Sequence, residues 1–395
     1  MMEPVYIVSG VRTGIGDFGG SLKDFPPSKL GELVIAEAVR RATLTPDDVQ
    51  HVVMGNVLPN EPKDAYLARV AAVNAGIPIA APALTLNRLC GSGLQAVVSA
   101  AQMITLGECD VAVAGGAESM TRAPHSVTAV RFGQKMGDVT MVDTLTATLS
   151  DPFEGIHMGV TAENVAGDYK ITRQMQDELA VTSHQRAARA RAEGRFAEQI
   201  LPIEIRDRKG VRVFDYDEHV RADASLDDMA KLKPVFKRDG SVTAGNASGI
   251  NDGAAALVLA SAAALKEKNL KPWAKILGWG YAGVEPSRMG IGPVKAVPIA
   301  LARAGLTLAQ IDVIESNEAF AAQACAVAQT LGFDKDKVNP NGSGISLGHP
   351  VGATGAILAV KALYELERIK GRYGLLTMCI GGGQGIAMVV ERLER

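Results

Sequence analysis

The sequence has few aromatic residues, little net charge and no long apolar run. Aromatic residues make up 5% of the 395 residues, and the formal net charge at pH 7 is −2. Such a chain offers no electropositive field for nucleic acid and no polybasic patch for a membrane surface. No uninterrupted apolar segment is long enough to span a bilayer, and residues 5–8 read as a strand where a signal peptide would stand. These absences predict that the protein binds neither nucleic acid nor a membrane.

Cysteine is equally scarce. The four cysteines are Cys90, Cys109, Cys325 and Cys379, far apart in the chain and without a CxxC pair or a Cys/His ligand spacing. This distribution argues against a disulfide framework and against a structural metal site. It predicts a protein of a reducing compartment, the cytoplasm, with no metal.

An internal repeat organises the chain, which is too long for a single ordinary core. Both copies read as a helix, a Leu-Thr turn, a strand ending in Asn, a Gly-Ser-Gly turn and a strand ending in glycines. The matching segments are 42–56 with 304–317, 87–93 with 339–344, and 111–116 with 376–382. Three pairs in the same order indicate two copies of one α/β unit.

The repeat also locates an insertion. The closing strand follows the glycines at once in the second copy (386–390), but in the first copy it lies at 254–259. Residues 121–249 therefore read as an inserted segment with one clear helix, Arg173 to Glu193. The two halves are then 1–120 plus 250–271 and 272–395.

Strands alternate with helices in each half, which predicts α/β layers with mostly parallel pairing. The symmetry further suggests that the buried helix after Cys90 packs against the helix after His349.

Cys90 stands between a short strand (83–86) and a helix that is apolar nearly all round. The Gly-Ser-Gly that follows it allows a close approach of backbone. A helix N-terminus favours a thiolate through its free amides and its dipole, so this is a place for a nucleophile. The alternative interpretation is a small buried apolar side chain.

Two familiar motifs are poor matches. Residues 14–19 fit G-x-G-x-x-G, but no strand runs directly into them and no helix follows directly, so we interpret them as a glycine loop. Residues 344–348 fit G-x-S-x-G around Ser346, but a nucleophile elbow requires a strand immediately before it. A serine hydrolase using Ser346 is kept as a rival hypothesis.

Three further groups fall at strand or loop ends of the duplicated unit. His349 lies in a glycine-rich loop, Cys379 ends a strand and precedes three glycines, and Asn317 ends another strand. Free backbone N–H groups after a strand are what an oxyanion site requires. Chemistry in open α/β sheets gathers at such ends, although a structural His or a helix-capping Asn explains each residue taken alone.

Five blocks, in this order, resemble the thiolase family across essentially the whole chain. They are Asn87-x-x-Cys90-Gly-Ser-Gly, Gly115-Gly-Ala-Glu-Ser-Met, Asn317-Glu-Ala-Phe, Gly348-His-Pro-x-Gly-Ala-Thr-Gly and Cys379-x-Gly-Gly-Gly-x-Gly. The resemblance implies duplicated βαβαβαββ halves in a layered α/β/α/β/α core with an inserted loop domain. It also implies reversible thiolytic cleavage of 3-ketoacyl-CoA, or condensation of acetyl-CoA with an acyl-CoA, with coenzyme A as substrate and no permanently bound cofactor.

The family's residue roles carry over to matching positions. Cys90 is similar to the acyl-accepting nucleophile, His349 to its base, and Cys379 to the acid/base at the α-carbon. Asn317 is similar to the residue that holds a water in a first oxyanion site. The backbone amides of Cys90 and Gly381 resemble a second oxyanion site. The coenzyme A groove is implied at His157, Met158, Arg221, Ala244, Ser248, Ala319 and Phe320.

The resemblance also implies a homotetramer, arranged as a dimer of dimers, and a role in fatty acid metabolism. The segment Gly342-Ser-Gly-Ile-Ser-Leu347 departs from the commoner form of the family, so acyl-chain preference is the property that this segment puts in question. Two alternatives share the fold: a 3-ketoacyl synthase-like enzyme acting on carrier-bound chains, and a non-catalytic lipid carrier. The first conflicts with Cys379 and its glycines, and the second with an intact set of candidate residues.

Overall fold

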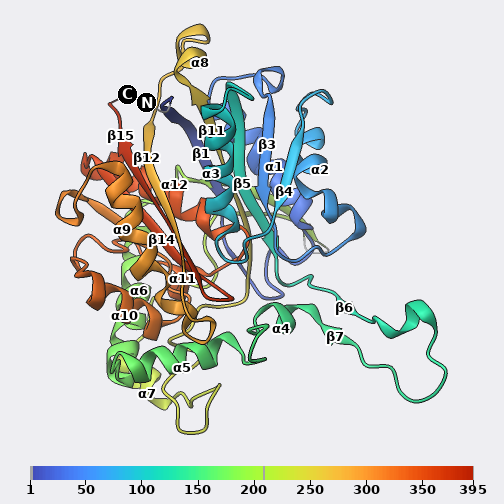
Figure 1. Ribbon diagram of the computed structural model, residues 1–395, viewed down its shortest axis with the longest axis vertical. Helices are drawn as coiled ribbons and strands as arrows, with labels where there is room; N and C mark the ends of the chain where they lie inside the picture. The colour runs from blue at the N-terminus through green and yellow to red at the C-terminus, as the bar shows by residue number, and fades with distance from the viewer. Residues whose placement is uncertain (1–2, 208–209, 395) are drawn as a thin grey trace.

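A computed structural model describes residues 3–207 and 210–394. In these residues eleven strands form one sheet, with nine of them in the order β13-β14-β15-β12-β1-β11-β5-β3-β4 (Figure 1). Their bounds are β1 Val5–Thr13, β3 His51–Gly55, β4 Ala83–Leu86, β5 Val111–Ser119, β11 Asn251–Ser261, β12 Ala274–Gly283, β13 Val313–Ser316, β14 Tyr373–Ile380 and β15 Gln384–Arg392. The short strands β2 (Gly16–Asp17) and β8 (Ile200–Leu201) pair with β11 and β1.

The strand order confirms the duplication. The series β3-β5-β11-β1 has its counterpart in β13-β14-β15-β12, and the two series meet at β1 and β12 through two residue pairs, Tyr6 with Lys275 and Ile7 with Ala274. The first half follows the order βαβαβαββ in full. In the second half the third strand is reduced to one bridge between Ile314 and Val338.

The expectation of mostly parallel pairing is wrong. Strand β3 is parallel to β4 and β5, and β13 is parallel to β14, but the remaining ladders along the nine-strand path are antiparallel. The reason lies in the last two strands of each half. Because β15 follows β14 through a short glycine turn, the chain reverses without a crossover helix, and a two-strand reversal of this kind is antiparallel. Strand β11 repeats that arrangement beside β5.

The repeated Leu-Thr turn is a capped 3₁₀ turn in both halves, at Pro46–Asp48 and Leu308–Gln310. The backbone N–H of Thr45 donates to Asp48 Oδ2 over 2.8 Å, and that of Thr307 donates to Gln310 Oε1 over 2.9 Å. The same reciprocal cap thus precedes β3 and β13.

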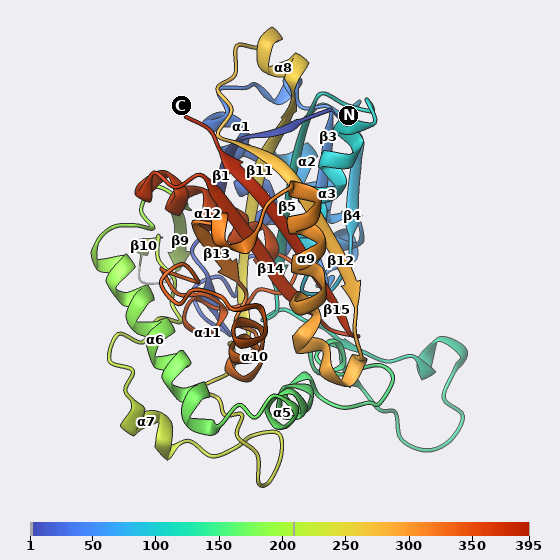
Figure 2. The ribbon, with the colours of Figure 1, turned by 60° about the vertical axis from the view of Figure 1, so that its left-hand side comes forward.

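Two central helices lie between the halves, as the symmetry suggested: α3 (Ser92–Thr105) and α12 (Thr354–Ile369) (Figure 2). A Cβ on Gly93 would stand 2.7 Å from the Ala356 nitrogen, and one on Gly355 would stand 2.3 Å from the Leu94 nitrogen. Glycine at both positions therefore permits the crossing. Helices α1 (Pro27–Arg41) and α2 (Leu67–Asn74) cover the first half on its outer side, and α9 (Gly292–Ala304) covers the second. The two series of strands, which join only at β1 and β12, are the two β layers, with α3 and α12 between them and the other helices outside. The α/β/α/β/α layering is therefore confirmed.

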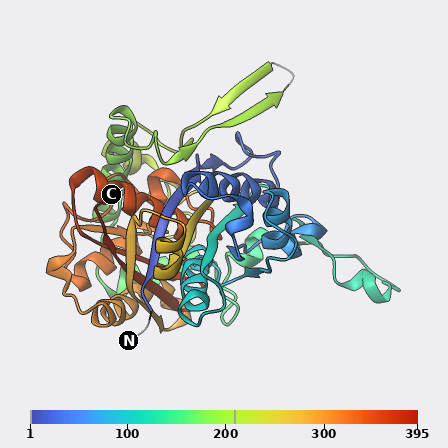
Figure 3. The same ribbon diagram turned by 90° about the horizontal axis from the view of Figure 1, so that it is seen from above.

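The chain leaves the sheet after β5 and returns to it at β11, where Ser119 stands opposite Asp252. The intervening residues form α4 (Thr144–Thr148), α5 (Met158–Asp168), α6 (Arg173–Ala192) and α7 (Leu226–Lys231), so the expected helix is present. They also form two extensions that point away from the body in different directions (Figure 3). One is the hairpin of β9 (Ile203–Asp207) and β10 (Gly210–Phe214), and the other is an arm with β6 (His125–Ser126) and β7 (Val142–Asp143).

The remaining helices are α8 (Ala262–Glu267), α10 (Ala321–Leu331) and α11 (Gly344–Leu347). Across residues 3–207 and 210–394, no helix combines the length and the apolar character that crossing a membrane requires. The glycine loop at 14–19 contains β2, and the next helix, α1, begins at Pro27, which agrees with rejecting a dinucleotide fingerprint there.

Candidate active site

Cys90 lies in the turn between β4 and α3, whose shape is held by Ser92. The Ser92 hydroxyl accepts the Arg88 N–H over 2.8 Å and donates to the Leu89 carbonyl over 2.7 Å. Leu89 has a positive φ of 45°, and a Cβ on Gly91 would stand 2.5 Å from Ile380 Cδ1. The turn therefore brings Cys90 against the end of β14 in the other half.

Two backbone amides act on the Cys90 sulfur. The N–H groups of Gly381 and of Cys90 itself hydrogen-bond to it and lower its pKa, but burial has the larger effect and raises the pKa of the thiol. The expectation that the helix N-terminus favours a thiolate is therefore not met in the resting site. Helix α3 begins two residues further on, at Ser92, and desolvation outweighs the nearby donors. A nucleophile at Cys90 therefore requires a base.

His349 provides a nitrogen suited to that purpose. Its side chain is buried, and its backbone N–H donates to Asn251 Oδ1 over 2.9 Å. Its Nδ1 lies 2.6 Å from Thr354 Oγ1, whose hydroxyl donates to the Pro350 carbonyl over 2.9 Å. Because Thr354 has only one hydroxyl proton, its oxygen must accept from His349 Nδ1–H. The proton on Nδ1 leaves Nε2 unprotonated, with a lone pair that can accept a proton.

For the thiolysis that the family resemblance implies, we therefore expect Thr354→Val to lower kcat by roughly 10- to 100-fold, with Thr354→Ser restoring most of it. Valine has the same shape but offers no acceptor to Nδ1–H, so the other tautomer becomes populated. Steady-state kinetics of both variants over a pH series measure this. Equal rates for the valine and serine variants would show that Thr354 only packs.

Burial of the imidazole lowers the pKa of His349 to about 4. A base is active in its neutral form, so its activity is present above this value and is lost as the pH falls through it. We expect kcat/KM for thiolysis to stay level between pH 7 and about pH 5.5, whereas a free imidazole would already be mostly protonated at the lower value. Stopped-time assays in constant-ionic-strength buffers measure the profile. A half-loss near pH 6.5 would contradict this assignment.

Cys379 and Asn317 stand behind these groups. Cys379 is the last but one residue of β14 and is fully buried, and burial together with the nearby Cys90 holds the pKa of its thiol well above the usual value. Asn317 follows β13, with Nδ2 3.3 Å from His349 Nε2. Its Oδ1 is buried and has no hydrogen-bond partner among residues 3–207 and 210–394, so it is free to accept from a bound molecule. The structure thus brings together all four groups singled out at strand and loop ends.

Glu118 is a structural contributor that the sequence did not single out, although it stands inside the block Gly115-Gly-Ala-Glu-Ser-Met. Its buried carboxylate accepts four N–H donors at 2.9–3.1 Å, from the side chain of Asn56 and the backbone of Val57, Leu58 and Gly352. Burial raises the pKa of Glu118 to about 8, and the backbone donors act in the opposite direction. By holding Gly352, Glu118 ties the His349 loop to the first half. The available signal was an acidic residue near the end of an otherwise apolar strand.

Ser346 is no rival to Cys90. It lies in α11, fully buried, 2.8 Å from the Ser183 hydroxyl, and it donates to the Ser343 carbonyl. No strand runs into α11, so the geometry of a nucleophile elbow is absent from this part of the described chain.

A cavity of about 470 Å³ opens over Cys90, His349 and Gly381. All seven residues expected in the coenzyme A groove line it: His157, Met158, Arg221, Ala244, Ser248, Ala319 and Phe320. Ala247 and Phe320 form a β-bridge, and the Ser248 N–H donates to the Ala319 carbonyl over 2.9 Å. The inserted segment and the second half therefore share this wall.

Phe236 and His219 also line the cavity and were not anticipated. The ring of Phe236 stacks on His157 with centroids 4.7 Å apart, and it meets Phe320 edge-on at 6.2 Å. His219 Nδ1 lies 2.6 Å from Asp17 Oδ1, and this bond is the main cause that lowers the pKa of Asp17. Neither residue stands in a glycine-rich block, so the sequence carried no signal for them.

A search of residues 3–207 and 210–394 finds no cluster of three or more His, Cys, Asp or Glu side chains arranged to hold a metal ion. The arrangement offers instead a thiol, a neutral imidazole, a second thiol that stays protonated, and converging amide donors. Such a set can form and cleave thioesters and move a proton to or from carbon.

Two models of one protein family match successive parts of the chain. Residues 5–263 match the family model described as "Thiolase, N-terminal domain", and residues 270–392 match "Thiolase, C-terminal domain". A β-ketothiolase of Cupriavidus necator is 62% identical over 394 residues, covering 100% of both chains. An acetyl-CoA acetyltransferase of the same organism is 50% identical over 393 residues, covering 99% of this chain and 100% of that one. The crystal structure of human mitochondrial 3-ketoacyl-CoA thiolase in complex with CoA matches with a TM-score of 0.97 at 44% identity, covering 100% of this chain and 99% of that one.

Proposed function

The chain belongs to the thiolase family, and we propose that Cys90, His349, Cys379, Asn317 and the Gly381 amide carry its reaction. That reaction is the reversible thiolytic cleavage of a 3-ketoacyl-CoA, which in reverse is a Claisen condensation of acetyl-CoA with an acyl-CoA. The observation that supports the assignment is the convergence of groups from both halves on the Cys90 sulfur. A carrier-bound synthase and a non-catalytic lipid carrier are not favoured, because the related proteins are thiolases.

Cleavage begins when Cys90 gives its proton to Nε2 of His349. The sulfur then attacks the 3-carbonyl carbon, and the carbonyl oxygen becomes an oxyanion. The amides of Cys90 and Gly381, already directed at the sulfur, are placed to donate to this oxygen. Donors of this kind contribute about 3 kcal/mol each to the transition state.

The bond between C2 and C3 then breaks. The acyl group stays on Cys90, and acetyl-CoA leaves as its enolate, whose oxygen faces the protonated His349 and a water held by Asn317. Cys379 donates its proton to C2, a role that suits a thiol kept protonated at neutral pH by its raised pKa. The thiol of free CoA then attacks acyl-Cys90 and gives its proton to the Cys379 thiolate, while Cys90 recovers its proton from His349.

The direct test is an assay of the purified protein with acetoacetyl-CoA and with longer 3-ketoacyl-CoA substrates, in both directions. We expect CoA-dependent cleavage of acetoacetyl-CoA with ping-pong kinetics, because the acyl group is held covalently between two substrates. The chain-length series then measures the effect of the unusual 342–347 segment. Release of free acetoacetate without CoA consumption would point to a hydrolase and reject the proposal.

The wall of the active-site cavity is proposed to bind coenzyme A as a substrate. The protein is proposed to hold no permanently bound cofactor. Arg221 is an exposed residue that lines this cavity, and its guanidinium group suits the phosphates of CoA. We expect Arg221→Gln to raise KM for CoA by about tenfold while kcat is retained, because the charge is remote from the reacting sulfur. Initial rates against CoA concentration measure this, and Arg206→Gln, on the β9–β10 hairpin, is the matched control. An equal fall in kcat would show that Arg221 acts in the chemical step.

We propose that the two halves are residues 1–120 plus 250–271 and residues 272–395. Residues 121–249 are proposed as a loop domain for CoA and oligomer contacts.

The arm that carries β6 and β7 supports a homotetramer built as a dimer of dimers. Its apolar side chains Val130, Phe132, Met136 and Met141 are 56–91% exposed. A second copy of the chain is proposed to cover them. Four free cysteines are consistent with a proposed cytoplasmic location. The proposed role in fatty acid metabolism rests on the proposed cleavage of 3-ketoacyl-CoA.

A further inference from the structure

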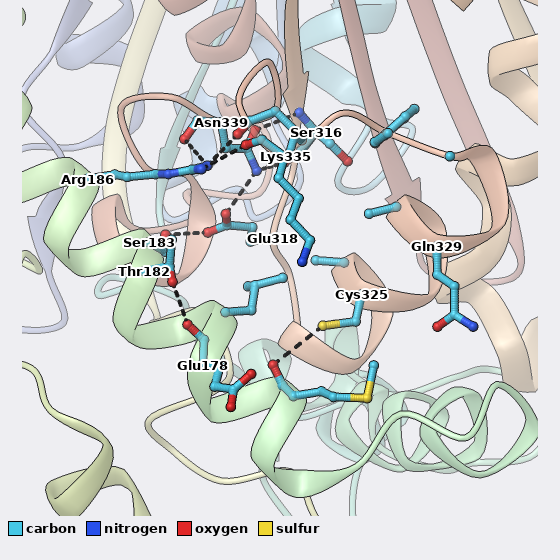
Figure 4. Close-up of a pocket in the computed structure, with 17 residues that line it drawn as sticks. Glu178, Thr182, Ser183, Arg186, Ser316, Glu318, Cys325, Gln329, Lys335 and Asn339 are labelled. Carbon is cyan, nitrogen blue, oxygen red and sulfur yellow. Dashed lines mark hydrogen bonds between the residues drawn. The ribbon is translucent and has the colours of Figure 1, made fainter.

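A second cavity, of about 590 Å³, lies between α6 and α10 (Figure 4). It shares no lining residue with the active-site cavity. Its size falls within the roughly 300–1,000 Å³ of small-molecule sites. Apolar atoms make up most of its surface, including those of Leu179, Phe333 and Val338, and polar side chains are interspersed among them.

One segment separates the two cavities. Ser316 and Glu318 line the second cavity, whereas Ala319 and Phe320 line the active-site cavity. Asn317 stands between them and contacts His349. A molecule in the second cavity therefore touches both neighbours of a candidate catalytic residue.

Glu318 is the buried carboxyl group of this cavity, and burial raises its pKa, whereas its hydrogen bonds and the charge of Lys361 act in the opposite direction. Its side chain is 4% exposed, and its carboxylate accepts from the Ser183 hydroxyl over 2.6 Å and from Asn339 Nδ2 over 2.9 Å. Among residues 3–207 and 210–394, no Lys, Arg or His nitrogen forms an ion pair with it within 4.0 Å, although other ion pairs do form. A buried carboxylate beside an empty apolar space is stabilised by any cation that enters.

The other charges around this cavity lie closer to solvent or are already engaged. Glu178 and Lys335 are exposed. The Arg186 guanidinium donates to the carbonyls of Val338, Asn339 and Lys335. Lys361 acts on Glu318 only through its charge and is paired with Glu315, so neither it nor Arg186 nor Lys335 forms an ion pair with Glu318.

We propose that this cavity is an effector site for a small primary amine with an apolar body, whose ammonium group binds Glu318. Asn339 links that carboxylate to the active site. Besides donating to Glu318, its side chain exchanges hydrogen bonds of 2.9 and 2.8 Å with the backbone N–H and carbonyl of Ser316. An ammonium that draws Glu318 away from Asn339 loosens the segment that holds Asn317 against His349. Binding therefore lowers kcat.

The test uses 2-phenylethylamine as the probe and phenylacetate as its matched control, with the same ring and the opposite charge. Calorimetric titration of the full-length protein without CoA measures binding independently of the thiolase reaction. Thiolysis rates with each probe measure inhibition. We expect saturable binding of the amine, at least tenfold weaker binding of phenylacetate, and a fall in kcat of at least twofold that excess CoA does not relieve.

Two variants test whether the amine binds in this cavity and at Glu318. Ala328→Phe fills the cavity from α10 and is expected to abolish both binding and inhibition while thiolysis without probe continues. Glu318→Gln is expected to weaken binding at least tenfold. No saturable binding, equal binding of both probes, binding unaffected by Ala328→Phe, or binding without a change in kcat would each overturn the proposal.

Discussion

Replacing Cys90 by serine is expected to lower kcat/KM for thiolysis of acetoacetyl-CoA by at least about 10³-fold. The reason lies in the base as much as in the nucleophile. Burial lowers the pKa of His349 to about 4, so its imidazole is a weak base that accepts a proton from a thiol far more readily than from an alcohol. Gly381 and Cys90 N–H groups directed at the sulfur favour the thiolate further, whereas a serine oxygen is smaller and harder to ionise.

Mass spectrometry of the protein after quenching provides the second readout. We expect the native protein incubated with acetyl-CoA to gain one acetyl group on the peptide that contains Cys90, and the Cys90→Ser variant to gain none at a comparable rate. Ser346→Ala is the matched control, because Ser346 is buried in α11 and does not line the active-site cavity. Full activity in Cys90→Ser together with loss of activity in Ser346→Ala would reject Cys90 as the nucleophile.

Replacing Cys379 by serine is expected to lower thiolysis by roughly 10²- to 10³-fold while leaving the transfer of acetyl from acetyl-CoA to Cys90 largely intact. In acetyl transfer Cys379 only gives a proton to the departing CoA thiolate, which also leaves readily as the anion, whereas cleavage of the C2–C3 bond requires a proton at the carbon C2. A serine hydroxyl at this buried position is a much weaker acid than the thiol, even though burial raises the pKa of Cys379.

The two half-reactions separate this role from a structural one. Acetyl-Cys90 formation is followed by quenched mass spectrometry, and α-carbon chemistry by exchange of solvent deuterium into the methyl group of acetyl-CoA. We expect the first to persist and the second to be lost. Cys325→Ser, a change at a partly exposed cysteine outside the site, controls for loss of a thiol in general. Equal loss of both half-reactions would mean that Cys379 supports the fold of the site and not the proton transfer.

Much of the fold could be read from local patterns that repeat. The Leu-Thr turn, the Gly-Ser-Gly turn and the strand that ends in glycines recur in order, and each is a short-range pattern whose geometry depends on neighbouring residues. The caps at Thr45 and Thr307 show why such patterns are reliable: the residues that make the bonds are three positions apart. Strand direction was misjudged, because the alternation of strands and helices favours parallel pairing, whereas β14 and β15 have no helix between them and β11 pairs with β5 in the same antiparallel way.

The candidate site divides in the same way. Cys90, His349, Cys379 and Asn317 stood out because each follows or precedes glycines or a strand end, which are features of sequence. Glu118, Phe236 and His219 did not, because each takes its place through partners on other elements, such as Gly352 for Glu118 and Asp17 for His219. The ionisation of Cys90 was also misjudged, since the helix dipole is a local effect but desolvation depends on everything packed around the sulfur.

By itself, then, the sequence determined the duplicated α/β unit, the place of the insertion, the family and the residue types available for thioester chemistry. Only the tertiary structure decided which atoms meet. It set the direction of the strands, the lone pair on His349 Nε2 through Thr354, the protonated resting state of Cys90, and the wall that separates the Glu318 cavity from the active site. The physical reason is range: turns and caps are settled within a few residues, whereas burial, tautomer and cavity shape arise from contacts between segments far apart in the chain.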